Sequence, residues 1–188
     1  MKTATIIHGT PSEEEYLEPL GASQSNKHWI PWLQHQLIIN GYHTWTPEMP
    51  QPHQPNYELW RQEFERYTLN EQSLLVGHSC GGGFLLRWLS ENPIKVARTI
   101  LVAPWLDPQQ RKDPDFFDFK LESALAERTN LHIFSSTNDA EDIDISISMI
   151  KAACPATQHS IFEGYGHFCL ADLRSERFPE LLATLLAN

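Results

Sequence analysis

Short apolar runs alternate with longer amphipathic segments along most of the chain. The runs that we expect to form strands are 3–9, 42–48, 73–78, 98–104, 131–136 and 158–164. The segments that we expect to form helices are 28–40, 57–69, 81–92, 120–129, 145–154 and 175–188. Short strands separated by helices are typical of a mostly parallel sheet with helices on both faces. We therefore expect one α/β domain of about six strands that spans residues 1–188.

The expected helix at 57–69 has the clearest one-sided apolar pattern. The residues near its apolar face are Leu59, Trp60, Phe64 and Tyr67. Two segments with several prolines, 49–55 and 103–119, interrupt the alternation of strands and helices. We expect both to be loops within the domain, because proline disfavours the interior of regular elements.

Several residues that can bind or react come directly after expected strands. They are His8-Gly9-Thr10, Gly77-His78-Ser79, Asp139 and Gly166-His167. Ligands of parallel α/β sheets bind beyond the carboxyl ends of the strands, which meet at one edge. We therefore expect these residues to lie close together at that edge.

Residues 77–81 have the form G-x-S-x-G between an expected strand and an expected helix. This pattern is the nucleophile elbow, in which a serine sits on a sharp, strained turn. Glycines two positions before and after Ser79 remove side chains that would collide with nearby backbone. The alternative is a plain glycine-rich turn or a phosphate loop. A Walker-type phosphate loop needs a lysine where this chain has Phe84.

A serine nucleophile needs a histidine base, and the histidine needs an acid that holds its tautomer. The expected chain order is serine, then acid, then histidine. Ser79, Asp139 and His167 follow that order. Asp142 is the main rival to Asp139, because it lies in the same acidic run at 138–144. The other carboxylates of that run are typical of a solvated helix start.

An acyl-transfer site also needs two backbone N–H groups that bind the oxyanion. The pattern places one on Cys80, after the serine, and the other on Thr10, after the first strand. Candidate substrate contacts are Trp105, Phe168 and His78, which lie beside expected strand ends. Packing in the core is the alternative for each of these three side chains.

The chain carries a formal net charge of −10, from 24 Asp and Glu against 14 Lys and Arg. Such a surface repels phosphate backbones and anionic membranes, so we expect neither nucleic acid nor a membrane as a partner. The three cysteines have no metal-ligand spacing and are typical of free thiols in a reducing cytoplasm. No apolar run approaches the ~20 residues of a membrane span. We expect a cytoplasmic protein without metal or cofactor, and its oligomeric state stays open.

A set of short motifs extends over most of the chain. They are HG at 8–9, W-x-x-W at 29–32, MP at 49–50, Trp60, LLVGHSCG at 74–81, ILVAP at 100–104, the aspartate after FSSTN, and GHF at 166–168. In these motifs the chain resembles the YdeN-like and retinoblastoma-binding protein nine family of small serine hydrolases, within the α/β-hydrolase superfamily. The resemblance implies a six-stranded domain without a large lid. It also implies that Ser79, Asp139 and His167 form the triad and that small esters or amides are hydrolysed.

Two departures from the family pattern matter. The family often has D-x-x-V or D-P-x-V after the fifth strand, where this chain has NDAEDID, so the choice between Asp139 and Asp142 stays open. The retinoblastoma-binding motif L-x-C-x-E is absent, so no such binding is expected.

We expect a carboxylesterase-like serine hydrolase that cleaves small ester, thioester or activated amide substrates through an acyl-enzyme. The alternative is a protein-interaction module on a hydrolase fold with weak or vestigial catalysis, since fold and motif do not prove turnover. A third possibility is acyl transfer or haloperoxidase-like chemistry on the same triad.

Overall fold

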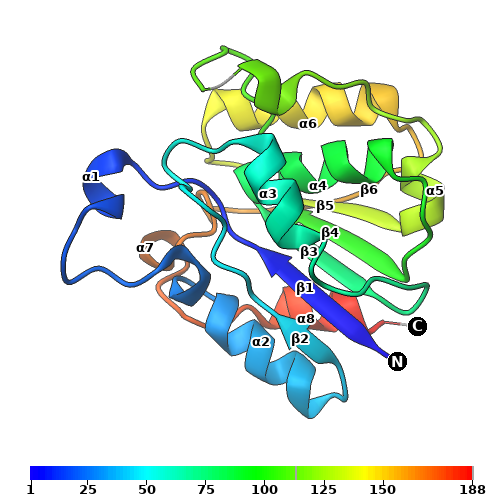
Figure 1. The fold of residues 1–188 in the computed structure, drawn as a ribbon, viewed down its shortest axis with the longest axis horizontal. Coiled ribbons are helices and arrows are strands. Elements are labelled where there is room, and N and C mark those ends of the chain that lie inside the picture. Colours follow the sequence, from blue (N-terminus) through cyan, green and yellow to red (C-terminus); the bar gives the residue numbers. More distant parts are fainter. Residues whose placement is uncertain (113, 188) are drawn as a thin grey trace.

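A computed structural model describes residues 1–112 and 114–187. Asp113, in the expected loop at 103–119, and Asn188, at the end of the last expected helix, lie outside the described residues. Figure 1 shows a twisted sheet whose strands follow the order β2-β1-β3-β4-β5-β6, and every pairing is parallel. The strands are β1 (Thr3–Ile7), β2 (His43–Trp45), β3 (Leu74–His78), β4 (Arg98–Val102), β5 (Leu131–Ser136) and β6 (Gln158–Phe162). The expected α/β fold with six parallel strands is confirmed.

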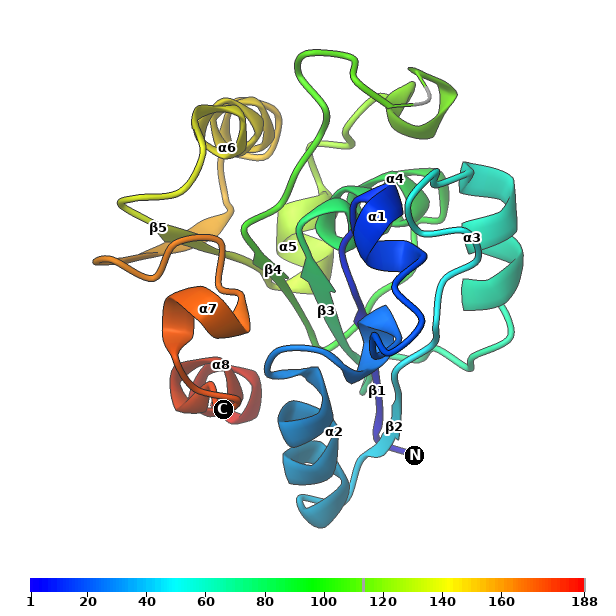
Figure 2. The same cartoon turned by 90° about the vertical axis from the view of Figure 1, so that its left-hand side faces the viewer.

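Helices cover both faces of the sheet, as Figures 1 and 2 show. On one face lie α2 (Ile30–Ile39) and α8 (Pro179–Leu186), and on the other lie α3 (Tyr57–Phe64), α4 (Cys80–Glu91) and α6 (Glu141–Ala153). Shorter helices are α1 (Glu13–Tyr16), α5 (Leu125–Thr129) and α7 (Leu170–Leu173). Among the described residues, no helix combines the length and the apolar character that a bilayer crossing requires.

The sheet core is apolar because its central strands are covered on both faces. Every residue of β1 and β3 is buried, and so are four of the five residues of β4. Strands buried on both faces read as continuous apolar runs and do not alternate. This is why the runs at 73–78 and 98–104 were recognisable in the sequence.

The helix expected at 57–69 is shorter than predicted, and its buried face includes the predicted Trp60 and Phe64 but not Leu59. It ends at Phe64, and its buried residues are Tyr57, Trp60 and Phe64. These positions lie at i, i+3 and i+7, which is one face of a helix. Leu59 was predicted to lie on that face, but it is 38% exposed. A single leucine exposed at the surface is common in soluble proteins.

Two other expected helices have different bounds. The helix predicted at 120–129 is confined to Leu125–Thr129. The one predicted at 145–154 begins earlier, at Glu141, and has three carboxylates in its first turn. Those carboxylates lie near the positive end of the helix dipole, which favours starting the helix there. This early start places the beginning of α6 beside the carboxyl ends of β4 and β5.

Strand order reverses between β1 and β3. The chain passes from β1 outward to β2 and then returns to the other side of β1. In open α/β sheets such a switch point leaves a crevice beyond the strand ends. The loops after β1 and β3 both enter this crevice, because a β-carbon on Gly9 would lie only 3.0 Å from the β-carbon of Ser79.

Candidate active site

Ser79 forms the turn between β3 and α4 by itself. Strand β3 ends at His78 and helix α4 begins at Cys80, so Ser79 must reverse the backbone in one residue. Its φ of 53° and ψ of −120° are a conformation that non-glycine residues rarely adopt. Such strain persists only where the surrounding structure imposes it.

Two glycines make this turn possible. A β-carbon on Gly77 would lie 2.7 Å from the Gly81 carbonyl oxygen, and one on Gly81 would lie 2.4 Å from the His8 carbonyl oxygen. Real β-carbons do not approach backbone oxygens so closely, so any side chain at either position would push the elbow away from the sheet. The close packing of α4 against the loop after β1 therefore fixes where the Ser79 hydroxyl stands.

His167 and Asp139 are in direct contact across the ends of β5 and β6. The His167 Nδ1 atom lies 3.0 Å from both carboxylate oxygens of Asp139. The Asp139 side chain is only 3% exposed, whereas His167 is 33% exposed. A buried carboxylate accepts hydrogen bonds, so the proton of a neutral His167 ring lies on Nδ1 and its Nε2 is the basic atom.

The loop that carries His167 is tied to the loop that carries Asp139. The Ser136 hydroxyl oxygen accepts the Tyr165 amide at 2.8 Å, and the Asn138 side-chain oxygen accepts the Gly166 amide at 2.8 Å. These bonds join the two loops immediately before each of the two polar residues. The segment 136–138, part of the FSSTN motif, therefore helps to set the distance between imidazole and carboxylate.

Asp142, the rival acid, has other partners. Its Oδ2 atom accepts the Trp105 indole N–H at 2.9 Å and is paired with the Arg111 guanidinium. No contact joins it to His167 within residues 1–112 and 114–187. The structure therefore brings Asp139, and not Asp142, to the imidazole.

Thr10 and Cys80, the two predicted oxyanion residues, have backbone amides without a hydrogen bond among the described residues. Thr10 follows β1, and Cys80 is the first residue of α4, where an N–H has no partner inside its own helix. Across the described parts of the chain, neither amide donates a hydrogen bond. A pair of unsatisfied N–H groups beside a serine hydroxyl is suited to bind a developing negative charge.

His8 determines the direction of the Thr10 amide. The Met49 amide donates to His8 Nε2 at 2.9 Å, so the proton of the neutral ring must be on Nδ1. Nδ1–H then donates to the Gly9 carbonyl oxygen at 2.7 Å. Burial lowers the pKa of His8 and keeps the ring neutral. Because the next peptide is trans, holding the Gly9 carbonyl points the Thr10 N–H the opposite way.

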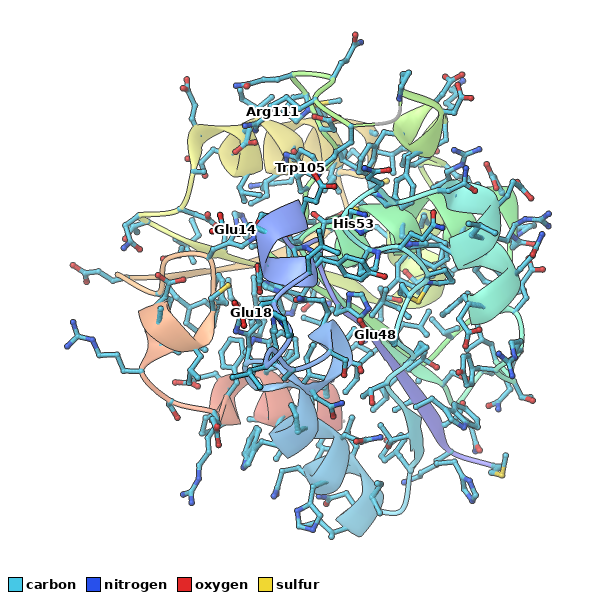
Figure 3. All side chains as sticks on the ribbon, turned by 60° about the vertical axis from the view of Figure 1, so that its left-hand side comes forward. Glu14, Glu18, Glu48, His53, Trp105 and Arg111 are labelled. Atoms are coloured by element: carbon cyan, nitrogen blue, oxygen red, sulfur yellow. The ribbon has the colours of Figure 1, made fainter. Side chains whose placement is uncertain are left out.

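One pocket of about 540 Å³ opens at these residues. Its walls are formed by Thr10, Ser79, Trp105, Arg111, Lys112, Asp139, Ala140, Asp142, Ile143 and His167. Trp105 was predicted to contact substrate and does line this pocket. Figure 3 shows Trp105 between α6 and α1, with Arg111 above it beside α6. Arg111 and Lys112 were not singled out in the sequence, because they lie in an irregular loop without a motif.

Phe168 and His78 were also predicted to contact substrate, and the structure places both elsewhere. Phe168 is fully buried and its ring stacks on Phe178 with centroids 5.6 Å apart. His78 points beneath the elbow, where its Nε2–H donates to the His167 carbonyl oxygen at 2.8 Å. Burial lowers the pKa of His78 well below its ordinary value. Both residues support the His167 loop from inside, because their backbone positions turn them toward the core.

Ser79 and His167 share the pocket, but the structure has no hydrogen bond between them within the described residues. Catalytic hydrogen bonds are often long in ligand-free enzymes and shorten when substrate binds. Cys80 is fully buried, and burial raises the pKa of its thiol. A buried, protonated thiol is inert, so the side chain at this position does not compete with the serine.

Comparisons with known proteins show the family and the fold of this chain. Residues 19–167 match the family model described as serine hydrolase. Over 90 residues, 47% of this chain, the sequence is 39% identical to "Putative hydrolase YdeN" of Bacillus subtilis (strain 168), and the match spans 42% of that relative. The crystal structure of the ydeN gene product from B. subtilis is similar with a TM-score of 0.79 and 25% identity, covering 98% of this chain and 97% of that one.

A more distant structure shares the fold alone. An alpha-beta serine hydrolase homologue from Coxiella burnetii is similar with a TM-score of 0.62 and 18% identity, and the superposition covers 99% of this chain and 85% of that one. The family match covers most of the chain, including the elbow and the segment up to His167. The chain therefore belongs to the serine hydrolase family, within the α/β-hydrolase fold.

Proposed function

We propose that this hydrolase cleaves esters of small carboxylic acids, with thioesters and activated amides as further substrates, through a covalent acyl-enzyme. The observation that carries the proposal is the shared pocket of Ser79 and His167, in which the imidazole is already held by the buried carboxylate of Asp139. A strained serine beside an oriented base is the arrangement that nucleophilic acyl transfer requires.

In the first step, His167 Nε2 takes the proton of the Ser79 hydroxyl while Oγ attacks the substrate carbonyl carbon. Asp139 keeps its contact with Nδ1 and stabilises the imidazolium that forms. The amides of Thr10 and Cys80 bind the oxyanion. His167 then returns the proton to the leaving alcohol as the carbon–oxygen bond breaks, which leaves an acyl group on Ser79.

In the second step, water attacks the acyl-enzyme with His167 again acting as base. The carbonyl–Ser79 bond breaks, the hydroxyl regains its proton, and the carboxylic acid leaves. For both steps, the Ser79 hydroxyl and His167 Nε2, which line the same pocket, must come within hydrogen-bond distance of each other. The pocket of about 540 Å³ has room for a small acyl group.

Fluorophosphonate labelling with mass spectrometry tests the nucleophile. We expect one adduct on Ser79, and we expect S79A to lose both labelling and p-nitrophenyl ester turnover. S148A is the matched control, since Ser148 is exposed on α6 and bonds only its own helix. An adduct at another residue, or full turnover in S79A, would contradict the proposal. Labelling of Ser79 without hydrolysis across esters of graded acyl length would favour a protein-interaction role instead.

A further inference from the structure

The loop after β4 presents two adjacent cations to the pocket. Asp107 is a buried carboxylate, 4% exposed, that accepts the Arg111 amide at 2.8 Å and the Lys112 amide at 2.7 Å. Both bonds join the carboxylate to backbone amides, so they fix the course of the loop without involving the side chains of Arg111 and Lys112. Both cationic side chains line the pocket that contains Ser79.

The two cations differ in their partners. The Arg111 guanidinium is paired with Asp142, so its charge is compensated. The Lys112 ammonium donates to the His53 carbonyl oxygen at 3.0 Å, its one hydrogen bond within the described residues. Within residues 1–112 and 114–187, no carboxylate oxygen lies within 4.0 Å of it. An ammonium has three N–H donors, so two of them have no protein acceptor.

Lys112 is half-buried and lines the same pocket as Ser79. Burial raises the pKa of the Cys80 thiol, the charge of Lys112 lowers it and the charge of Asp107 raises it. A partly desolvated charge interacts with an opposite charge more strongly than an exposed one does. In a chain with a net charge of −10, a pocket cation without a carboxylate ion pair within the described residues is a local exception to the acidic surface.

We propose that Lys112 binds a carboxylate on the substrate, so that the enzyme prefers esters that carry a negative charge on the acyl group or the leaving group near the scissile bond. This inference rests on the proposed function, because it names the substrate class of the same site. The apolar faces of Trp105 and Ile143 would then pack against the carbon chain between the carboxylate and the ester.

Two pairs of substrates separate the two positions of the charge. Mono-4-nitrophenyl glutarate against 4-nitrophenyl butyrate places the carboxylate on the acyl side. The acetyl ester of 4-hydroxybenzoate against that of methyl 4-hydroxybenzoate places it on the leaving group. For each pair, the ratio of kcat/KM for the charged to the neutral ester is measured in the wild type, K112M, K112R and K120M. Lys120 is the matched control, since it is exposed on the same loop region and lies outside this pocket.

We expect K112M to lower the ratio about ten- to hundredfold in one pair, which is the value of a hydrogen bond to a charged group. K112R and K120M should keep most of the wild-type ratio of charged to neutral ester. Added salt should reduce the wild-type preference for the charged ester. Because the ratio compares two esters on one protein sample, partial unfolding of a variant cancels. An unchanged ratio in K112M for both pairs, or an equal fall in K120M, would overturn the inference. Wild-type hydrolysis of neutral esters through Ser79 would then leave the proposed function intact, whereas hydrolysis of neither ester would overturn both.

Discussion

His8 offers a direct test of how the first loop contributes to catalysis. Its ring makes one bond at each nitrogen, accepting from the Met49 amide at Nε2 and donating to the Gly9 carbonyl at Nδ1. Asn places an amide nitrogen near the position of Nδ1, and Gln places an amide oxygen near that of Nε2. H8N therefore keeps the bond to Gly9, and H8Q keeps the bond to Met49.

The structure allows the size of the effect to be worked out. Each variant loses one neutral hydrogen bond, so each should lose about 1 kcal/mol of unfolding free energy. Only H8Q releases the Gly9 carbonyl and with it the direction of the Thr10 N–H. A bond of about 1 kcal/mol favours the oriented peptide over its other orientations by roughly fivefold. Complete loss of an oxyanion donor costs about 10²–10³ in kcat. Because losing this bond lowers the population of the oriented peptide at most about fivefold, we expect a loss of up to about fivefold in kcat for H8Q, with KM little changed.

The assay is the kcat and KM of p-nitrophenyl ester hydrolysis, with urea unfolding of both variants in parallel. The affinity of a trifluoromethyl ketone, whose adduct carries an oxyanion, should fall in H8Q more than in H8N. Equal losses of kcat in the two variants at equal stability would show that His8 serves only to pack the loop. A wild-type kcat in H8Q would show that the Thr10 amide does not depend on this contact.

Three further outcomes follow from the site and its support. D139N should lower kcat about 10³- to 10⁴-fold by disturbing the imidazole tautomer. D142N should mainly raise KM, and the reverse pattern in steady-state kinetics would reassign the acid. G81A should cost about 3 kcal/mol or more in urea unfolding, because its β-carbon would meet a main-chain oxygen at 2.4 Å. G164A, at φ +75° with nothing within 4 Å, should cost only about 1 kcal/mol, and equal costs would contradict the packing argument. Because burial lowers the pKa of His78 while the unfolded ring keeps its ordinary value near 6.5, stability should be level above pH 6.5 and fall below it, and a urea midpoint that does not fall between pH 7 and pH 5.5 would refute this.

Much of the fold could be predicted because the relevant signals are local. Continuous apolar runs marked the buried strands, and the glycines of residues 77–83 marked the elbow before any neighbour was known. The helix at 57–69 was mispredicted at Leu59, because two overlapping apolar faces fit the same short segment and only packing chooses between them. The positions of Ser79, Asp139 and His167 at strand ends followed from the topology of a parallel sheet.

The direction of each side chain needed the tertiary structure. Asp139 and Asp142 lie three residues apart in one acidic run, and their difference arises from their partners: His167 for the first, Trp105 and Arg111 for the second. Nothing in the order of residues says which carboxylate faces an imidazole 25 or more positions away. The contact between Asp139 and His167 depends on the hydrogen bonds that join the loop after β5 to the loop after β6.

The sequence alone determined the class of fold, the strained serine turn and the residue types available for acyl transfer, since these depend on periodicity, glycine placement and chain order. Only the tertiary structure decided that Phe168 and His78 support the site from within, that His8 orients an amide, and that Lys112 lines the pocket without a carboxylate partner among the described residues. The physical reason is that burial, pairing and orientation are properties of contacts between distant segments, and those contacts exist only once the chain has folded.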